Sequence, residues 1–169
     1  GQAIISQWSQ YSGWITMATA PFLGASVDRL GRRKGWLAFC TILMAPLMVA
    51  LWWAKPDGSG LSVTAVMIIT TIIGLLFSYT EVLHNSLLVR AAGMEGAHKA
   101  SSLALALANI FALVALGFTA WAFALPGLGL PLVPEHPLFG LNPAAGETSR
   151  ITGPMAGLLL ALGALPLFL

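Results

Sequence analysis

Three polar side chains inside a long apolar stretch are the residues best suited to chemistry in this chain. Glu81, His84 and Asn85 lie at positions i, i+3 and i+4, so a helix would carry all three on one face. A carboxylate within a membrane is costly unless it pairs or reaches water. One interpretation is a solute cavity or proton-coupling cluster, in which Glu81 carries the proton and His84 modulates it. The alternative is a hydrogen-bonded cluster between helices near a cytoplasmic gate.

A second candidate is Asn109, the single strongly polar residue in the middle of another apolar stretch. It lies one position from a seam of small residues at spacing four, Ala104, Ala108 and Ala112, which favours close helix packing. Asn109 therefore either faces the cavity or bonds a neighbouring helix. No cofactor is expected, because the histidines lie in different segments and the only cysteine is Cys40. The chain also lacks a Gly-Lys-Ser/Thr phosphate loop, which excludes ATP-driven transport within this segment.

The elements that position these side chains are predicted to be membrane helices. Of the 169 residues, 57% are hydrophobic and 8% are charged, whereas a soluble domain carries about 25% charged residues. At about 20 apolar residues per crossing, the uncharged stretches predict an all-α membrane protein built as a bundle of five transmembrane helices. The spans cover about 8–27, 35–54, 61–89, 101–124 and 151–169. The few charges also exclude a nucleic-acid-binding surface.

Two connections between these spans are distinctive. Residues 28–34 form a short basic loop, and residues 125–150 contain so many prolines and glycines that no regular helix is expected. In an alternating topology six basic residues fall on one side of the membrane: Arg29, Arg32, Arg33, Lys34, Arg90 and Lys99. Lys55 and Arg150 fall on the other side. The excess of positive charge predicts that loop 28–34 is cytoplasmic and loop 125–150 extracytoplasmic.

The short basic loop carries the most specific motif of the sequence. Its diagnostic residues are Gly24, Asp28, Arg29, Gly31, Arg33 and Lys34. Their spacing resembles the cytoplasmic loop between the second and third helices of major facilitator superfamily transporters. The resemblance implies that Asp28 and the basic residues latch the cytoplasmic ends of two helical halves in one state of a transport cycle. It also implies that the spans are helices 2 to 6 of a twelve-helix fold, completed by helix one and a C-terminal half.

A weaker resemblance narrows the class of transporter. Residues 80–88, the proline-rich loop and residues 153–168 resemble the branch related to vacuolar amino-acid effluxers. The arginine-led motif that many proton antiporters carry on helix four is absent, which disfavours drug–proton antiport.

The sequence therefore predicts a secondary active transporter, not an enzyme, that moves a small solute such as an amino acid by alternating access. It predicts an integral, multi-pass protein of a bacterial inner membrane. One alternative is a non-transporting receptor or assembly protein. A membrane enzyme with Glu81 and His84 as acid and base is less favoured, because the sequence supplies neither a nucleophile nor metal ligands for it.

Overall fold

The computed structural model describes residues 13–15, 17–19 and 33–167, and this part of the chain contains helices and loops without strands. Its longer elements are α2 (Arg33–Ala50), α3 (Val63–Thr119) and α5 (Thr152–Ala164). Its shorter elements are η1 (Leu51–Trp53), η2 (Ala120–Ala124), η3 (Leu138–Gly140), η4 (Pro143–Ala145), α4 (Glu147–Arg150) and η5 (Leu165–Leu167). The all-α fold class is confirmed.

Three helical segments of the described chain are long and apolar enough to cross a membrane. They are Lys34–Trp53, Val63–Val89 and Glu95–Ala124, with 20, 27 and 30 residues. At a rise of about 1.5 Å per residue each spans roughly 30 Å or more, the thickness of a bilayer's hydrocarbon core. The second of these segments is part of α3, and the third runs from α3 through η2. We call them the first arm (Val63–Val89) and the second arm (Glu95–Ala124).

The expectation of five membrane spans is wrong for the part of the chain described, which has three. The span expected at 151–169 is the 13-residue helix α5, which is only about 20 Å long. Pro166 follows its end, and a proline has no backbone N–H for the hydrogen bond that would continue an α-helix. The chain accordingly passes into the short turn η5 after Ala164. The span expected at 8–27 lies mostly outside the described residues, of which 13–15 and 17–19 are helical.

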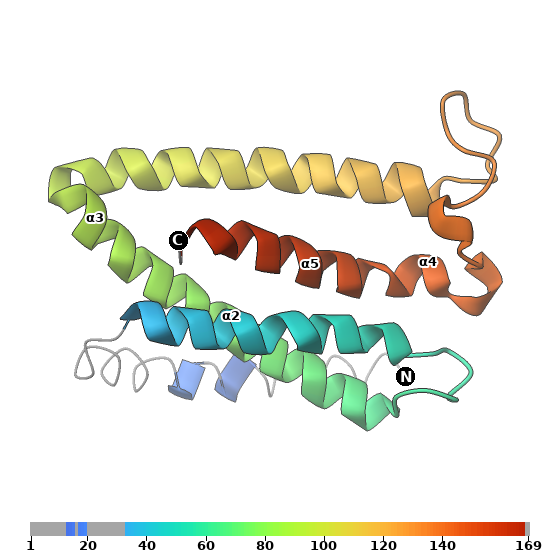
Figure 1. The fold of residues 1–169 in the computed structure, drawn as a ribbon, viewed down its shortest axis with the longest axis horizontal. Helices are drawn as coiled ribbons and strands as arrows, with labels where there is room; N and C mark the ends of the chain where they lie inside the picture. The colour runs from blue at the N-terminus through green and yellow to red at the C-terminus, as the bar shows by residue number, and fades with distance from the viewer. Residues whose placement is uncertain (1–12, 16, 20–32, 168–169) are drawn as a thin grey trace.

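The connection expected between the third and fourth spans is a sharp bend within α3. Residues 90–100 belong to α3, and among them only Gly93, with φ 69° and ψ 171°, leaves helical geometry. That backbone conformation is open essentially to glycine alone. The segment contains no proline and several good helix formers, so the helix resumes directly after the bend. Figure 1 shows the second arm running back from this bend in the opposite direction.

The packed body of the protein consists of α2, α5 and the first arm, with α2 in contact with both of the others. Its main cluster buries Cys40, Met44 and Leu76. The contact between α5 and α2 is close because α5 presents glycines to it: a Cβ added at Gly157 would lie 2.8 Å from the carbonyl oxygen of Ala45. Small residues at such a contact let two backbones approach.

The second arm differs from the body in having almost no packed face. None of the residues in its most apolar 18-residue window is buried. It joins the rest of the described chain at its two ends, through the bend at Gly93 and through η2, where Ala122 and Phe123 are buried. At this second end the indole nitrogen of Trp121 donates a 2.7 Å hydrogen bond to the carbonyl oxygen of Leu132.

The elements place the described basic residues at two opposite ends of the molecule. In Figure 1 the start of α2 and the bend of α3 lie at one end, whereas the connections 51–62 and 125–151 lie at the other. The first end includes Lys34 and Lys99, and the second includes Lys55 and Arg150. This arrangement agrees with the separation of basic residues on which the predicted topology depends.

Candidate solute cavity and a polar clamp

A cavity of about 670 Å³ lies among the body and the second arm. Its walls come from four helical segments: Leu37 and Thr41 of α2, Phe77, Thr80, Glu81, His84 and Asn85 of the first arm, Ala108 and Phe111 of the second arm, and Leu159, Leu160, Gly163 and Ala164 of α5. A volume of this size accommodates a small organic molecule. The cavity therefore depends on the bend in α3, because both arms contribute to its wall.

The three polar residues singled out in the sequence line this cavity together. Phe77, Glu81, His84 and Asn85 are three or four residues apart along the helix, so they share the face of the first arm that lines the cavity. Glu81, His84 and Asn85 are all exposed side chains, and none makes a hydrogen bond or ion pair with another described residue. Within the part of the chain described, these groups do not form the interhelical hydrogen-bonded cluster of the alternative interpretation.

The two hydroxyl groups in the cavity wall are already engaged by their own helices. The hydroxyl of Thr41 donates to the carbonyl oxygen of Leu37 at 2.9 Å, and that of Thr80 donates to Phe77 at 2.7 Å. Such bonds between a threonine and the preceding helical turn satisfy the hydroxyl proton. A bound molecule would consequently find its main polar partners in the carboxylate, the imidazole and the amide of the first arm.

Asn109 does not line the cavity, although its neighbour Ala108 does. Its side-chain amide nitrogen donates to the carbonyl oxygen of Leu105 at 3.0 Å, within the same helix, and the residue is exposed. In this structure Asn109 satisfies part of its hydrogen-bonding capacity locally.

Most of the proposed latch motif lies outside the described residues. This holds for Gly24, Asp28, Arg29 and Gly31. Arg33 and Lys34 are described and form the first residues of α2, so the helix begins within the segment assigned to the basic loop. The side chain of Lys34 is exposed.

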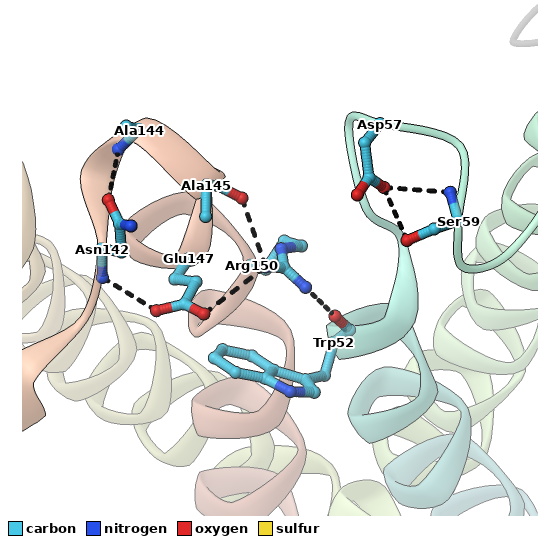
Figure 2. Close-up of polar contacts among 8 residues, drawn as sticks. All are labelled: Trp52, Asp57, Ser59, Asn142, Ala144, Ala145, Glu147 and Arg150. Carbon is cyan, nitrogen blue, oxygen red and sulfur yellow. Dashed lines mark hydrogen bonds and ion pairs between the residues drawn. The ribbon is translucent and has the colours of Figure 1, made fainter.

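A polar cluster at the other end of the molecule joins segments that are far apart in the sequence (Figure 2). We call it the polar clamp and define it as Trp52, Ala145, Glu147 and Arg150. One terminal nitrogen of Arg150 donates to the carbonyl oxygen of Trp52 at 2.7 Å, and the other donates to that of Ala145 at 3.2 Å. The guanidinium also lies 4.0 Å from the Glu147 carboxylate and 5.0 Å from the centre of the Trp52 ring.

The polar clamp is largely shielded from solvent, since the Arg150 side chain is only 10% exposed. A charge-assisted hydrogen bond in such a place is stronger than one in open water. The clamp ties η1, which follows α2, to η4 and α4, which precede α5. From the sequence, Arg150 was assigned only to the side of the membrane with few basic residues. The sequence did carry one signal for a role of this residue: Arg150 is a single cation at the end of a loop rich in proline and glycine.

Asp57 shapes the neighbouring turn between α2 and α3. Its carboxylate accepts hydrogen bonds from the backbone nitrogen and the hydroxyl of Ser59, each at 2.9 Å. The backbone bond, followed by the hydroxyl bond and then by the charge of Lys55, holds the pKa of Asp57 below its ordinary value. Together with Glu147 and Arg150 the turn borders a second cavity of about 370 Å³.

The described residues hold no group of three or more His, Cys, Asp or Glu side chains that could bind a metal ion. Comparisons with known proteins found no matching family model, no matching curated protein and no matching solved structure.

Proposed function

We propose that this chain is part of a secondary transporter that moves a small solute across a membrane by alternating access. The observation that carries the proposal is the cavity among three long apolar helical segments, lined by Glu81, His84 and Asn85. Carriers of this kind bind their solute between helices and expose the site to each side of the membrane in turn. The protein would be a multi-pass protein of a bacterial inner membrane, and its solutes would be small metabolites such as amino acids.

The arrangement of α3 supports this proposal. One wall of the cavity belongs to the second arm, which is packed only at its ends, while the opposite wall belongs to the well-packed body. A wall with few buried contacts costs little to displace. A change in the angle at Gly93 would open or close the cavity without disturbing the core around Met44.

The motif at residues 24–34 adds a second line of support through its resemblance to major facilitator transporters. On this proposal Asp28, Arg29, Arg33 and Lys34 latch the cytoplasmic ends of the helices. Helix one and a C-terminal half would complete the carrier. Glu81 is the candidate proton carrier of the cavity.

The test is solute flux through the complete carrier reconstituted in lipid vesicles, with the twenty radiolabelled amino acids as probes. Ala108 lines the cavity from the second arm, so Ala108→Trp would fill part of it. We expect this variant to reduce flux to near the level of protein-free vesicles. The matched control is Ala104→Trp, one helical turn away on the same arm and outside the cavity wall, which should leave most of the flux.

Two results would contradict the proposal. Binding of a solute without flux by the unsubstituted protein would indicate a receptor or assembly protein. Equal loss of flux in the two tryptophan variants would show that the cavity is not the solute pathway.

A further inference from the structure

The described wall of the cavity contains an acidic residue and no lysine or arginine, which limits the charge of a solute that could bind there. Among the described residues that line it, Glu81 is the only Asp, Glu, Lys or Arg. The described lysines and the clamp residue Arg150 lie outside its wall. An anionic solute would have to leave water without a countercharge in this wall and beside a carboxylate, which is strongly unfavourable. A cation would meet an opposite charge.

The rest of the wall suits an apolar body with aromatic or aliphatic character. Its large apolar members are Leu37, Phe77, Phe111, Leu159 and Leu160. Phe77 on the first arm and Phe111 on the second are each 58% exposed, so most of either ring remains free to contact a ligand. An aromatic face attracts an organic cation as well as apolar groups.

From this arrangement we infer that the cavity takes a small organic cation with an apolar body, with the positive group at Glu81 and the body between the two phenylalanines. The inference rests on the proposed function of a carrier for small metabolites, and it replaces amino acids, which carry a carboxylate, by organic cations without one as the proposed solutes. His84 and Asn85, on the same helical face, supply further polar partners around the bound solute. The absence of a basic residue from the described wall disfavours carboxylates and sulfonates as solutes.

The experiment compares three probes of similar shape and different charge: benzyltrimethylammonium, benzyl alcohol and benzenesulfonate. Binding to the complete protein in detergent is measured by calorimetry at pH 8, above the range in which histidine side chains usually change charge. The quaternary ammonium keeps its charge at every pH, so the measurement reports the site and not the ligand. We expect the ammonium to bind more tightly than the alcohol, and the sulfonate not to bind measurably.

The decisive variant is Glu81→Gln, which keeps the shape of the side chain and removes its charge. It should weaken ammonium binding about tenfold or more, equivalent to at least about 1.4 kcal/mol, and should leave the alcohol unaffected. The matched control is Glu95→Gln, the same change on the second arm outside the cavity wall. It should alter ammonium binding by no more than about twofold.

The outcomes separate this inference from the proposed function. Binding of the sulfonate as tightly as the ammonium, or equal effects of the two glutamine variants, would overturn the cationic solute class even if amino-acid flux is observed. Selective ammonium binding lost in Glu81→Gln, in a protein that supports no flux, would uphold the site and contradict the transporter.

Discussion

Helix α5 and the second arm differ in length and in packing. The second arm is the longer helix but has few buried contacts, whereas α5 is shorter and closely packed. The second arm has 30 residues, more than enough to cross a membrane, yet its most apolar window has no buried residue. Helix α5 has only 13 residues but buries Gly157 and Ala164 and lies closely against α2. Hydropathy therefore identifies segments that can span a membrane, whereas the close contact between α5 and α2 comes from small residues on one helix face.

The same difference has a functional consequence. The cavity lies between these two regions, since α5 and the second arm both contribute to its wall. On the proposed transport function, the site would change shape by movement of its loosely packed wall. The comparison can be tested by disturbing the packed contact between α5 and α2, the polar clamp that joins η1 to α4 beside that contact, and the turn next to the clamp.

The packed contact gives the largest expected effect. A Cβ at Gly157 would already lie 2.8 Å from the Ala45 oxygen and 3.2 Å from Cβ of Met48, so Gly157→Leu must push α5 away from α2. Forcing a larger side chain into a packed contact typically costs about 1–3 kcal/mol, and we expect the upper part of that range. The measurement is the free energy of unfolding in mixed detergent micelles.

The control for this variant lies in the second arm. A Cβ at Gly117 would meet nothing within 4 Å, so Gly117→Leu should cause no loss of stability. It should even add up to about 1 kcal/mol, because leucine favours helix more than glycine does. If both substitutions destabilise the protein equally, the described contrast between a packed and an unpacked region is incorrect.

The sequence predicted the parts of the fold that depend on local composition. Uncharged stretches located α2 and both arms of α3 as long apolar helices, and helical spacing placed Glu81, His84 and Asn85 on one face. It overestimated α5, because an apolar run was counted by length and the effect of Pro166 on the helix end was not considered. It also replaced a bend at one glycine by a loop, because charged residues near Gly93 suggested a full break.

The polar clamp was beyond sequence reasoning for a different reason. Arg150 and Trp52 are 98 positions apart, and their contact forms only when α5 packs on α2. Local patterns carry no information about such pairs. The sequence also could not predict that Ala108 and Phe111 line the same cavity as Glu81, because their positions depend on the angle of the bend in α3.

The polar clamp gives the prediction with the next largest expected effect on stability. Arg150→Ala removes a short hydrogen bond to Trp52 and a longer one to Ala145, and a bond from a charged donor contributes about 1.5–3 kcal/mol. It also removes the buried Nε of Arg150, which has no partner among the described residues and lowers the net gain. We therefore expect a loss of about 2 kcal/mol in the free energy of unfolding. Hydrogen exchange should rise in residues 142–151 and in η1, while the core around Met44 stays protected. Arg150→Lys should recover part of the loss, since lysine keeps the charge but not the planar fork of donors. Uniform loss of protection would show that the clamp is not a local device.

The smallest effect is expected at Asp57, in the turn beside the clamp. The hydrogen bonds from Ser59 lower its pKa in the folded protein. A lowered pKa means that the carboxylate stabilises the turn fully above the ordinary aspartate value of about 4, and that this contribution is lost as the pH falls through the lowered value.

NMR titration should therefore place the Asp57 midpoint below that of a free aspartate. Ser59→Ala should raise the midpoint only in part, because the backbone bond is the larger cause. An unchanged midpoint in Arg150→Ala would show that the turn is set by its own residues, and a shifted one would couple it to the clamp.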